Sequence, residues 1–316
     1  MEQYKNLRAV VTGGAGFIGS HLVEKLLALG ADVAIIDNFL YGSKIEHLRG
    51  QKKLTICEGD VRDTKVVSRV LKNKDVVFHL AACVGVEETQ MSPLEVLDVE
   101  IQGTLNVLNQ SVNNDIKRVI LASSSEVYGD SLEPMEEDEP FFPKTTYALT
   151  KMVGEEYCRA FHKKYGTEYT CLRYFNIYGP RQDERFVIPR FVARLSSGKS
   201  IQIYGDGTQT RDFTYIDDAV VMTLLAGIKP EAKCQAINIG TGIMNTINAI
   251  AGLLLNIMDK KSIKPVYIDY DGKRPREIEI LTRHANTTRA TRLLQYQPKT
   301  DLRSGITKYI TWCTGG

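Results

Sequence analysis

A glycine-rich segment near the N-terminus constrains the fold of this chain more than any other feature. The sequence TGGAGFIG at 12–19 separates an apolar, β-branched run at 8–12 from an amphipathic stretch at 17–29. A strand that turns through glycines into a helix allows a tight turn and a close approach of the backbone to a pyrophosphate. The free N–H groups at the start of the helix then face the phosphates. The residues expected to bind a dinucleotide here are Gly13, Gly16, Phe17, Ile18 and Gly19.

An acidic residue after the second apolar run supports the same interpretation. Asp37 follows Gly19 by 18 residues, close to the spacing of roughly 20 for a carboxylate that accepts from the adenosine ribose hydroxyls. A carboxylate there repels a 2′-phosphate, so NAD is favoured over NADP as the cofactor. We expect Asn38 and Ser43 to lie beside it, and Asp60 and Val61, after the third strand, to bracket the adenine.

The distribution of apolar runs predicts an α/β fold. Runs rich in Val and Ile at 8–12, 32–36, 54–57, 75–78 and 118–121 alternate with helical stretches. Such runs are typical of strands covered on both faces, and the alternation predicts right-handed crossovers in a parallel sheet. The fold class is therefore a doubly wound parallel (Rossmann) sheet.

After Asn176 the alternation of strands and helices becomes less regular, and Pro and Gly separate shorter elements. This change predicts a second lobe. We expect an NAD-binding domain at 1–176 and, at 177–316, mainly a smaller, mixed lobe that binds the substrate. A strand near 235–239 is expected to return to the main sheet.

Composition excludes several classes of protein. The 316 residues are 43% hydrophobic and 25% charged, with a formal net charge of +2, which argues against disorder and against a broad nucleic-acid-binding face. The six cysteines form no C-x-x-C pair, so neither a zinc site nor a disulfide framework is indicated. The residues at 1–14 do not have the pattern of a signal peptide, and no apolar stretch has membrane-spanning length, so we expect neither a signal peptide nor a membrane span. We expect a soluble, cytoplasmic protein with no metal, nucleic-acid or membrane partner.

A tyrosine and a lysine one helical turn apart suggest acid–base chemistry. Tyr147 and Lys151 are at i and i+4, which places both side chains on one helix face. A nearby ammonium stabilises a phenolate, so Lys151 is expected to lower the pKa of Tyr147 toward neutrality. The tyrosine is then a base that takes a proton from a hydroxyl as hydride leaves the same carbon. The SSSEVYG segment at 123–129 follows the strand that ends at Leu121, and its hydroxyls are expected to hold the reacting oxygen.

These segments together resemble a known family. The chain is similar to the extended short-chain dehydrogenase/reductases that act on nucleotide-sugars, UDP-glucose 4-epimerase among them. The matching segments are TGGAGFIGS at 12–20, DN at 37–38, GD at 59–60, HLAA at 79–82, SSSEVYG at 123–129, YALTK at 147–151, RYFNIYGPRQ at 173–182 and YGDGTQTRDFTYIDD at 204–218. The resemblance implies a tightly held NAD that oxidises a nucleotide diphosphate sugar at C4, and a homodimer.

The resemblance also implies roles for single residues. Tyr147 is the base, Lys151 its partner and a ligand of the nicotinamide ribose, and Ser124 the hydroxyl partner. The other cofactor-binding positions implied are Leu80, Ala81, Ala82 and Tyr174, and the substrate-binding positions are Asn176, Arg211 and Arg274. Arg276 competes with Arg274 for its role, and Glu277 replaces the acid of the family's R-x-x-D motif.

Two departures from the family pattern keep the reaction open. Glu100 stands where many members carry asparagine, near the expected nicotinamide. Ser125-Glu126 replaces the Asp-Glu pair of 4,6-dehydratases and matches the Ser-Glu of uronate decarboxylases, so both residues are candidate catalytic groups. We expect a 4-epimerase that moves hydride from C4 to NAD and back. The alternatives are a UDP-glucuronate decarboxylase or another 4-keto-forming lyase or dehydratase that uses Glu126, a dehydrogenase that stops at the ketone, and a non-catalytic NAD sensor or scaffold.

Overall fold

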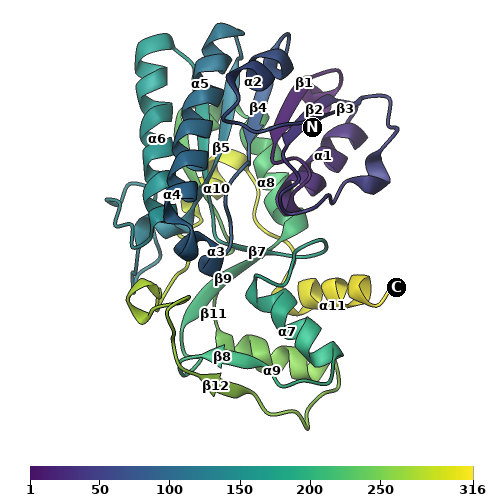
Figure 1. Ribbon diagram of the computed structural model, residues 1–316, viewed down its shortest axis with the longest axis vertical. Coiled ribbons are helices and arrows are strands. Elements are labelled where there is room, and N and C mark those ends of the chain that lie inside the picture. Colours follow the sequence, from purple (N-terminus) through teal and green to yellow (C-terminus); the bar gives the residue numbers. More distant parts are fainter. Residues whose placement is uncertain (316) are drawn as a thin grey trace.

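The computed structural model, which describes residues 1–315, has a large lobe built on a parallel sheet and a smaller lobe below it (Figure 1). Within these residues the main sheet has seven strands in the order β10-β6-β5-β4-β1-β2-β3, and all neighbours are parallel. Its strands are β1 (Arg8–Thr12), β2 (Asp32–Asp37), β3 (Leu54–Glu58), β4 (Val76–His79), β5 (Arg118–Ser124), β6 (Glu168–Tyr174) and β10 (Gln235–Ile239). The order reverses beside β1, which is the arrangement expected of a doubly wound sheet.

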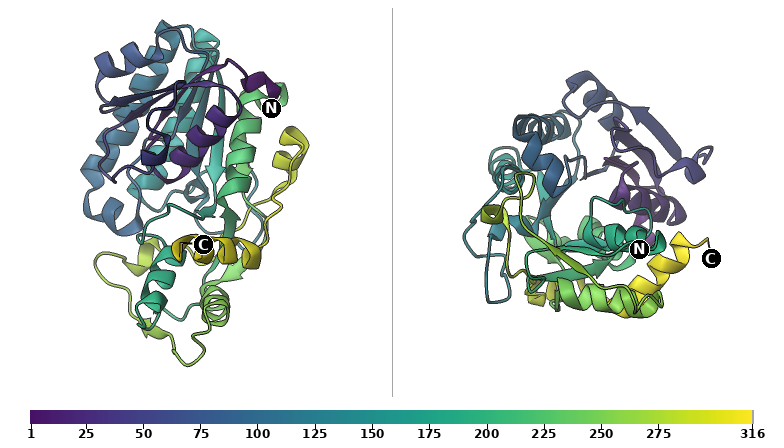
Figure 2. Two further views of the ribbon diagram at one scale, coloured as in Figure 1. Left: turned by 90° about the vertical axis from the view of Figure 1, so that its right-hand side faces the viewer. Right: turned by 60° about the horizontal axis from the view of Figure 1, so that its bottom comes forward.

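Helices cover both faces of this sheet, and Figure 2 shows the same layers from two further sides. Successive strand residues point to opposite faces, so Val11 packs in the core on one face of the sheet, whereas Val10 packs in the core on the other face. The helices are α1 (Phe17–Ala28), α2 (Thr64–Leu71), α3 (Val86–Met91), α4 (Pro93–Leu97), α5 (Gly103–Asn113), α6 (Thr146–Tyr165), α7 (Val187–Ser196), α8 (Ile216–Ile228), α9 (Ile247–Ile257), α10 (Thr288–Leu294) and α11 (Leu302–Cys313). The predicted Rossmann fold is confirmed.

Short helical turns complete these connections. The 3₁₀ turns are η1 (Glu2–Tyr4), η2 (Glu46–Leu48), η4 (Ser125–Tyr128), η5 (Pro230–Ala232) and η6 (Arg276–Ile278), and η3 (Asp98–Gln102) is a π turn between α4 and α5. None of the helices within residues 1–315 combines the length and the apolar character that crossing a membrane requires.

The smaller lobe is built from short strands and from α7, α9 and α11 (Figure 1). One small sheet has the order β11-β9-β7, with β7 parallel and β11 antiparallel to β9, and in the other β12 pairs with β8. These strands are β7 (Asn176–Tyr178), β8 (Gln202–Tyr204), β9 (Thr210–Tyr215), β11 (Met244–Thr246) and β12 (Val266–Ile268).

The chain passes back into the large lobe after residue 176. The strand β10 pairs with β6 of the main sheet, at the position that the sequence predicted for 235–239. The helix α8 packs against α1, and α10 packs against β10. Because segments after residue 176 contribute to both lobes, no single position in the chain separates the two lobes. The domain boundary at residue 176 therefore stays a prediction.

Candidate active site

A pocket lies at the carboxyl ends of the main strands and is closed on its other side by the smaller lobe. Parallel strands present their carboxyl ends at one edge of a sheet, so segments far apart in the sequence meet there. The sequence-predicted residues that line it are Gly13, Gly16, Phe17, Ile18, Gly19, Asp37, Asn38, Asp60, Val61, Leu80, Ala81, Ala82, Ser124, Ser125, Glu126, Tyr147, Lys151, Tyr174, Asn176, Arg211 and Arg274. The structure therefore brings almost every predicted position to one cavity.

Ser43, Arg276 and Glu277 are the predicted positions that the structure does not bring to the pocket wall. Ser43 lies between two lining residues, Gly42 and Lys44, and its own hydroxyl is buried without a partner. Arg276 and Glu277 lie on η6, where both side chains are exposed to solvent.

The glycine turn packs too tightly for side chains. Gly13 has a φ of +68°, and a Cβ on it would lie 2.8 Å from the backbone nitrogen of Ala81. A Cβ on Gly19 would lie 2.1 Å from the carbonyl oxygen of Gly13. The turn is thus held against the end of β4, and α1 begins after Gly16 with its first N–H groups at the pocket. This cradle fits the pyrophosphate of a dinucleotide.

Asp37 is fixed at the end of β2 by two backbone donors. Its Oδ2 accepts from the N–H of Ala15 at 2.9 Å, and its Oδ1 accepts from the N–H of Phe39 at 2.8 Å. A carboxylate has about four lone-pair positions, so two remain for ribose hydroxyls. Burial raises the pKa of Asp37, and the two N–H donors oppose that rise. These residues fit NAD.

Tyr147 and Lys151 lie in the first two turns of α6. Thr145 caps this helix, since its Oγ1 accepts from the N–H of Ala148 at 3.0 Å. The ammonium of Lys151 lies 5.3 Å from the centre of the Tyr147 ring. Its nitrogen also lies 2.7 Å from Oε2 of Glu100, a buried carboxylate.

The expected fall of the Tyr147 pKa is not present in this structure. Burial raises the pKa of Tyr147 to about 12, and Lys151 lowers it only in part. The negative charges of Glu100 and Glu126 act in the same direction as burial. Lys151 acts in the predicted direction, but in the protein alone desolvation and the two carboxylates outweigh it, so a fall of the Tyr147 pKa to neutrality stays a prediction.

The turn after β5 places three predicted residues together. The strand is three residues longer than predicted and ends at Ser124. The hydroxyl of Ser124 accepts from the N–H of Glu126, and Thr145 donates its hydroxyl proton to Oε2 of Glu126 at 3.1 Å. Glu126 is thereby oriented at the pocket wall close to Tyr147.

Arg283 faces Glu126 and was missed by the sequence analysis. Its Nη1 lies 3.6 Å from Oε1 of Glu126, its side chain is 7% exposed, and its buried Nε has no partner among residues 1–315. Arg283 also lines the pocket. The only signal in the sequence was a basic residue two positions after the apolar pair Ile280-Leu281, which is weak.

The arginines expected to bind substrate share one carboxylate. Arg274 lies 2.7 Å from Glu279, and Arg211 forms an ion pair with the other oxygen of the same residue. Glu279 is buried and lines the pocket, whereas Glu277 is exposed. The acid that pairs with Arg274 in this structure is therefore Glu279, and the substrate-binding roles expected of Arg274, Arg276 and Glu277 stay predictions. The buried Oδ1 of Asn176, on the same pocket wall, has no partner.

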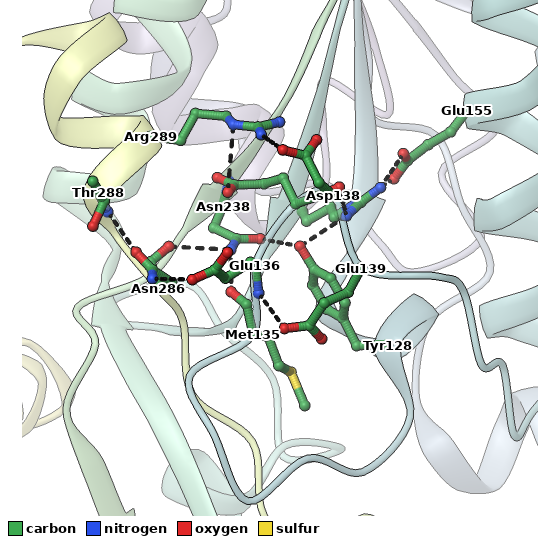
Figure 3. Close-up of polar contacts among 12 residues, drawn as sticks. Tyr128, Met135, Glu136, Asp138, Glu139, Glu155, Asn238, Asn286, Thr288 and Arg289 are labelled. Carbon is green, nitrogen blue, oxygen red and sulfur yellow. Dashed lines mark hydrogen bonds and ion pairs between the residues drawn. The ribbon is translucent and has the colours of Figure 1, made fainter.

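A polar network holds the segments that carry Glu126 and Arg283 (Figure 3). Tyr128 donates its hydroxyl proton to Asn238 Oδ1 at 2.7 Å, and Asn238 donates from Nδ2 to the carbonyl oxygen of Met135 at 2.8 Å. Met135 in turn donates its N–H to the carbonyl oxygen of His284. The network thus joins η4 to the residue next to Arg283 through buried contacts.

The parallel sheet, the glycine turn and the carboxylate at the end of β2 define a Rossmann-type dinucleotide-binding protein. Residues 9–240 match the NAD dependent epimerase/dehydratase family. The chain belongs to this family of enzymes, within the extended short-chain dehydrogenases/reductases that act on nucleotide-sugars, and its cofactor is NAD.

Relatives within the family differ in reaction. A Methanocaldococcus jannaschii protein provisionally named UDP-glucose 4-epimerase is 35% identical over 96% of this chain and 97% of its own length. A Bacillus cytotoxicus UDP-N-acetyl-alpha-D-glucosaminuronate decarboxylase is also 35% identical, with the same coverage of both chains. The crystal structure of Thermotoga maritima UDP-glucose 4-epimerase with UDP-glucose is 34% identical, with a TM-score of 0.90 over 98% of this chain and 99% of that one.

Proposed function

We propose that the protein decarboxylates a nucleotide-linked hexuronate after oxidising it at C4. One observation carries the proposal: the buried Arg283 faces Glu126 in the pocket wall and keeps an unpartnered Nε. Epimerisation of a neutral sugar at C4 needs neither group. Glu126 is the anion that faces this buried guanidinium in the protein alone, and the carboxylate of a hexuronate would supply an acceptor for its Nε.

Three of the arginines that line the pocket support a substrate with acidic groups. Arg211, Arg274 and Arg283 line it, and the carboxylates nearest to them are Glu279 and Glu126. Arg211 and Arg274 would bind the diphosphate, where a guanidinium binds two oxygens at once. Arg283 would then bind the C6 carboxylate. The relative from Bacillus cytotoxicus, which its name describes as a hexuronate decarboxylase, is consistent with this assignment.

The side chains supply the proton transfers of this reaction. The glycine turn and Asp37 would hold NAD, which would supply a hydride acceptor for C4 and the means to return that hydride. Tyr147 takes the proton of the C4 hydroxyl, with Ser124 holding that oxygen. The carboxylate at C6 is then β to a ketone, so the C5–C6 bond breaks, carbon dioxide leaves and its electron pair forms an enolate. Tyr147 stabilises the enolate oxygen, and Glu126 delivers a solvent-derived proton to C5. In the overall reaction, the hexuronate and one proton give the pentose and carbon dioxide.

A 4-epimerase is the second candidate. It requires only Tyr147, Lys151 and Ser124, all of which line the pocket, and the Methanocaldococcus jannaschii relative carries that name. A 4,6-dehydratase is less well supported, because the buried Ser125 hydroxyl is a poor acid for a leaving C6 hydroxyl.

A product analysis separates the two candidates. We would incubate the purified protein and NAD with UDP-glucuronate, UDP-N-acetylglucosaminuronate or UDP-glucose, and measure carbon dioxide and the proton NMR spectrum of the sugar. We expect a UDP-pentose and equimolar carbon dioxide from one of the uronates. Inversion at C4 with no carbon dioxide from any of them would establish the epimerase instead.

Replacing Arg283 tests the carboxylate site. Because a buried, paired charge is lost, we expect Arg283→Gln to lower kcat/KM for the uronate by about 100-fold. Arg292→Gln, an exposed change on the neighbouring α10, is the matched control and should retain activity. Equal activity of the two variants would reject Arg283 as the carboxylate ligand.

A further inference from the structure

Glu100 lies directly behind the active-site lysine. It is on the π turn η3, and its side chain is 3% exposed. One oxygen lies 2.7 Å from Lys151 Nζ, and the other accepts from the N–H of Cys83 at 2.9 Å. Lys151 lines the pocket and Glu100 does not. The carboxylate thus approaches the ammonium from the protein side and leaves its pocket side open.

The pair is buried on both sides, so its charges act at short range with little screening. Lys151 and Glu100 have side-chain exposures of 6% and 3%. Unit charges a few ångströms apart interact more strongly in a protein interior than in water, because the effective dielectric constant is lower. An unpaired ammonium there would strongly affect any charged group bound next to it. With Glu100 in contact, the negative charge of the carboxylate offsets part of the field that the ammonium produces on the pocket side.

The charge that matters is that of the nicotinamide ring, which is cationic when oxidised and neutral when reduced. A bare ammonium beside the ring disfavours the oxidised form. An asparagine at position 100 would hold Lys151 by a hydrogen bond without cancelling its charge, whereas a glutamate does both. A site that returns hydride in every turnover must rest with the oxidised cofactor.

We propose that Glu100 is a charge-balancing residue that neutralises Lys151, so that the pocket binds the oxidised dinucleotide nearly as well as the reduced one. Glu100 is a positioning residue, because it acts through Lys151 and does not line the pocket. The inference rests on the proposed placement of Lys151 beside the nicotinamide, and it does not depend on the fate of the sugar.

The test is a competition between the two forms of the cofactor. The full-length protein is equilibrated with mixtures of free NAD⁺ and NADH, separated by rapid filtration, and the ratio of the bound forms is measured by chromatography. Glu100→Gln retains an acceptor for the N–H of Cys83 and removes the charge. We expect the bound ratio to shift toward NADH by about tenfold, and Glu100→Asp to restore most of the wild-type ratio.

Glu155→Gln is the matched control. Glu155 is on the same helix as Lys151, is 3% exposed, and forms a buried ion pair with Arg173 at 2.8 Å. This variant should lower thermal stability and leave the bound ratio unchanged. An unchanged ratio in Glu100→Gln, with a native circular dichroism spectrum, would overturn the proposal.

A second pair of variants covers the case in which Glu100→Gln does not fold. Lys151→Met leaves the Glu100 carboxylate without its ammonium partner, so the ratio of the bound cofactors should shift toward NAD⁺. The double variant Lys151→Met with Glu100→Gln removes both charges, and its ratio should return to near the wild-type value. Equal ratios in the single and double variants would also overturn the proposal. No sugar is present in these measurements, so they fail or succeed independently of decarboxylation.

Discussion

Tyr147 lies among charges of opposite sign, and this determines when its hydroxyl is a base. Lys151 favours the phenolate, while burial, Glu100 and Glu126 favour the neutral phenol and raise the pKa to about 12. A cationic nicotinamide bound beside the ring would act in the same direction as Lys151. The tyrosine is therefore expected to become a useful base only when the oxidised cofactor is bound.

Replacing Tyr147 by phenylalanine tests this role. The change removes the hydroxyl and retains the ring, so we expect turnover to fall by about 1,000-fold, within the usual range for a lost general base. The affinity for NAD, measured by calorimetry, should stay within about threefold, because the glycine turn and Asp37 are untouched. Tyr157→Phe on the same helix, outside the pocket wall, is the control. Undiminished turnover in Tyr147→Phe would reject the tyrosine as the base.

At the scale of elements, His79 joins two strands and a helix at the edge of the pocket. Its Nδ1 lies 2.7 Å from the hydroxyl of Thr12 on β1, and its Nε2 lies 3.1 Å from the hydroxyl of Thr104 on α5. The Thr12 oxygen already accepts from two backbone N–H groups, so its proton goes to Nδ1. His79 is therefore neutral, with its proton on Nε2, and burial together with Lys151 lowers its pKa to about 3.

This histidine makes stability depend on pH. Its pKa is lower in the folded than in the unfolded protein, where it is about 6.5, so the unfolded chain binds more protons as pH falls. Folding stability should decrease below pH 6.5 and reach a plateau only near the folded value of about 3. Between pH 6.5 and 5 the expected loss is about 2 kcal/mol.

The measurement is urea unfolding at pH 7 and at pH 5 for the wild type and for His79→Gln, which retains a donor toward Thr104. His79→Gln should be less stable than the wild type at pH 7. Between pH 7 and pH 5, its free energy of unfolding should fall by about 2 kcal/mol less than that of the wild type. The same loss in both proteins would assign the pH dependence to other groups.

At the scale of the molecule, the sequence predicts the large lobe better than the smaller one. The glycines at 13–19 and the continuous apolar runs are local signals, and they fix both the sheet and the edge at which its ligands bind. The return of 235–239 to the main sheet was also visible as an apolar run. Each of these signals is read from neighbouring residues in the chain, although the pairing of 235–239 with β6 is long-range.

Pairs that depend on long-range packing were not predictable in this way. Glu126 meets Arg283 only because Met135 pairs with Ala285 and brings a turn-rich segment to η4. Glu279 was passed over for Glu277 because a motif gives spacing and not the direction in which η6 turns each side chain. Glu100 was recognised as unusual, but its contact with Lys151 requires the register of a π turn that no periodicity reveals.

The exposed apolar residues of α3, α4 and α6 predict that the protein is a homodimer. Leu94 is 80% exposed and Met91 63% exposed, and α4 packs beside α6, which carries the exposed Leu149 (Figure 1). Large apolar side chains grouped on adjacent helices are typical of an interface, because their burial against a second copy stabilises the pair. We expect light scattering after size exclusion to give twice the 35.4 kDa chain mass.

Two variants test where the interface lies. Leu94→Lys should give a monomer that still binds NAD. Leu132→Lys, which alters an 85% exposed loop residue, should stay dimeric. A wild-type monomer at micromolar concentration would refute the dimer, and a dimeric Leu94→Lys variant would place its interface elsewhere.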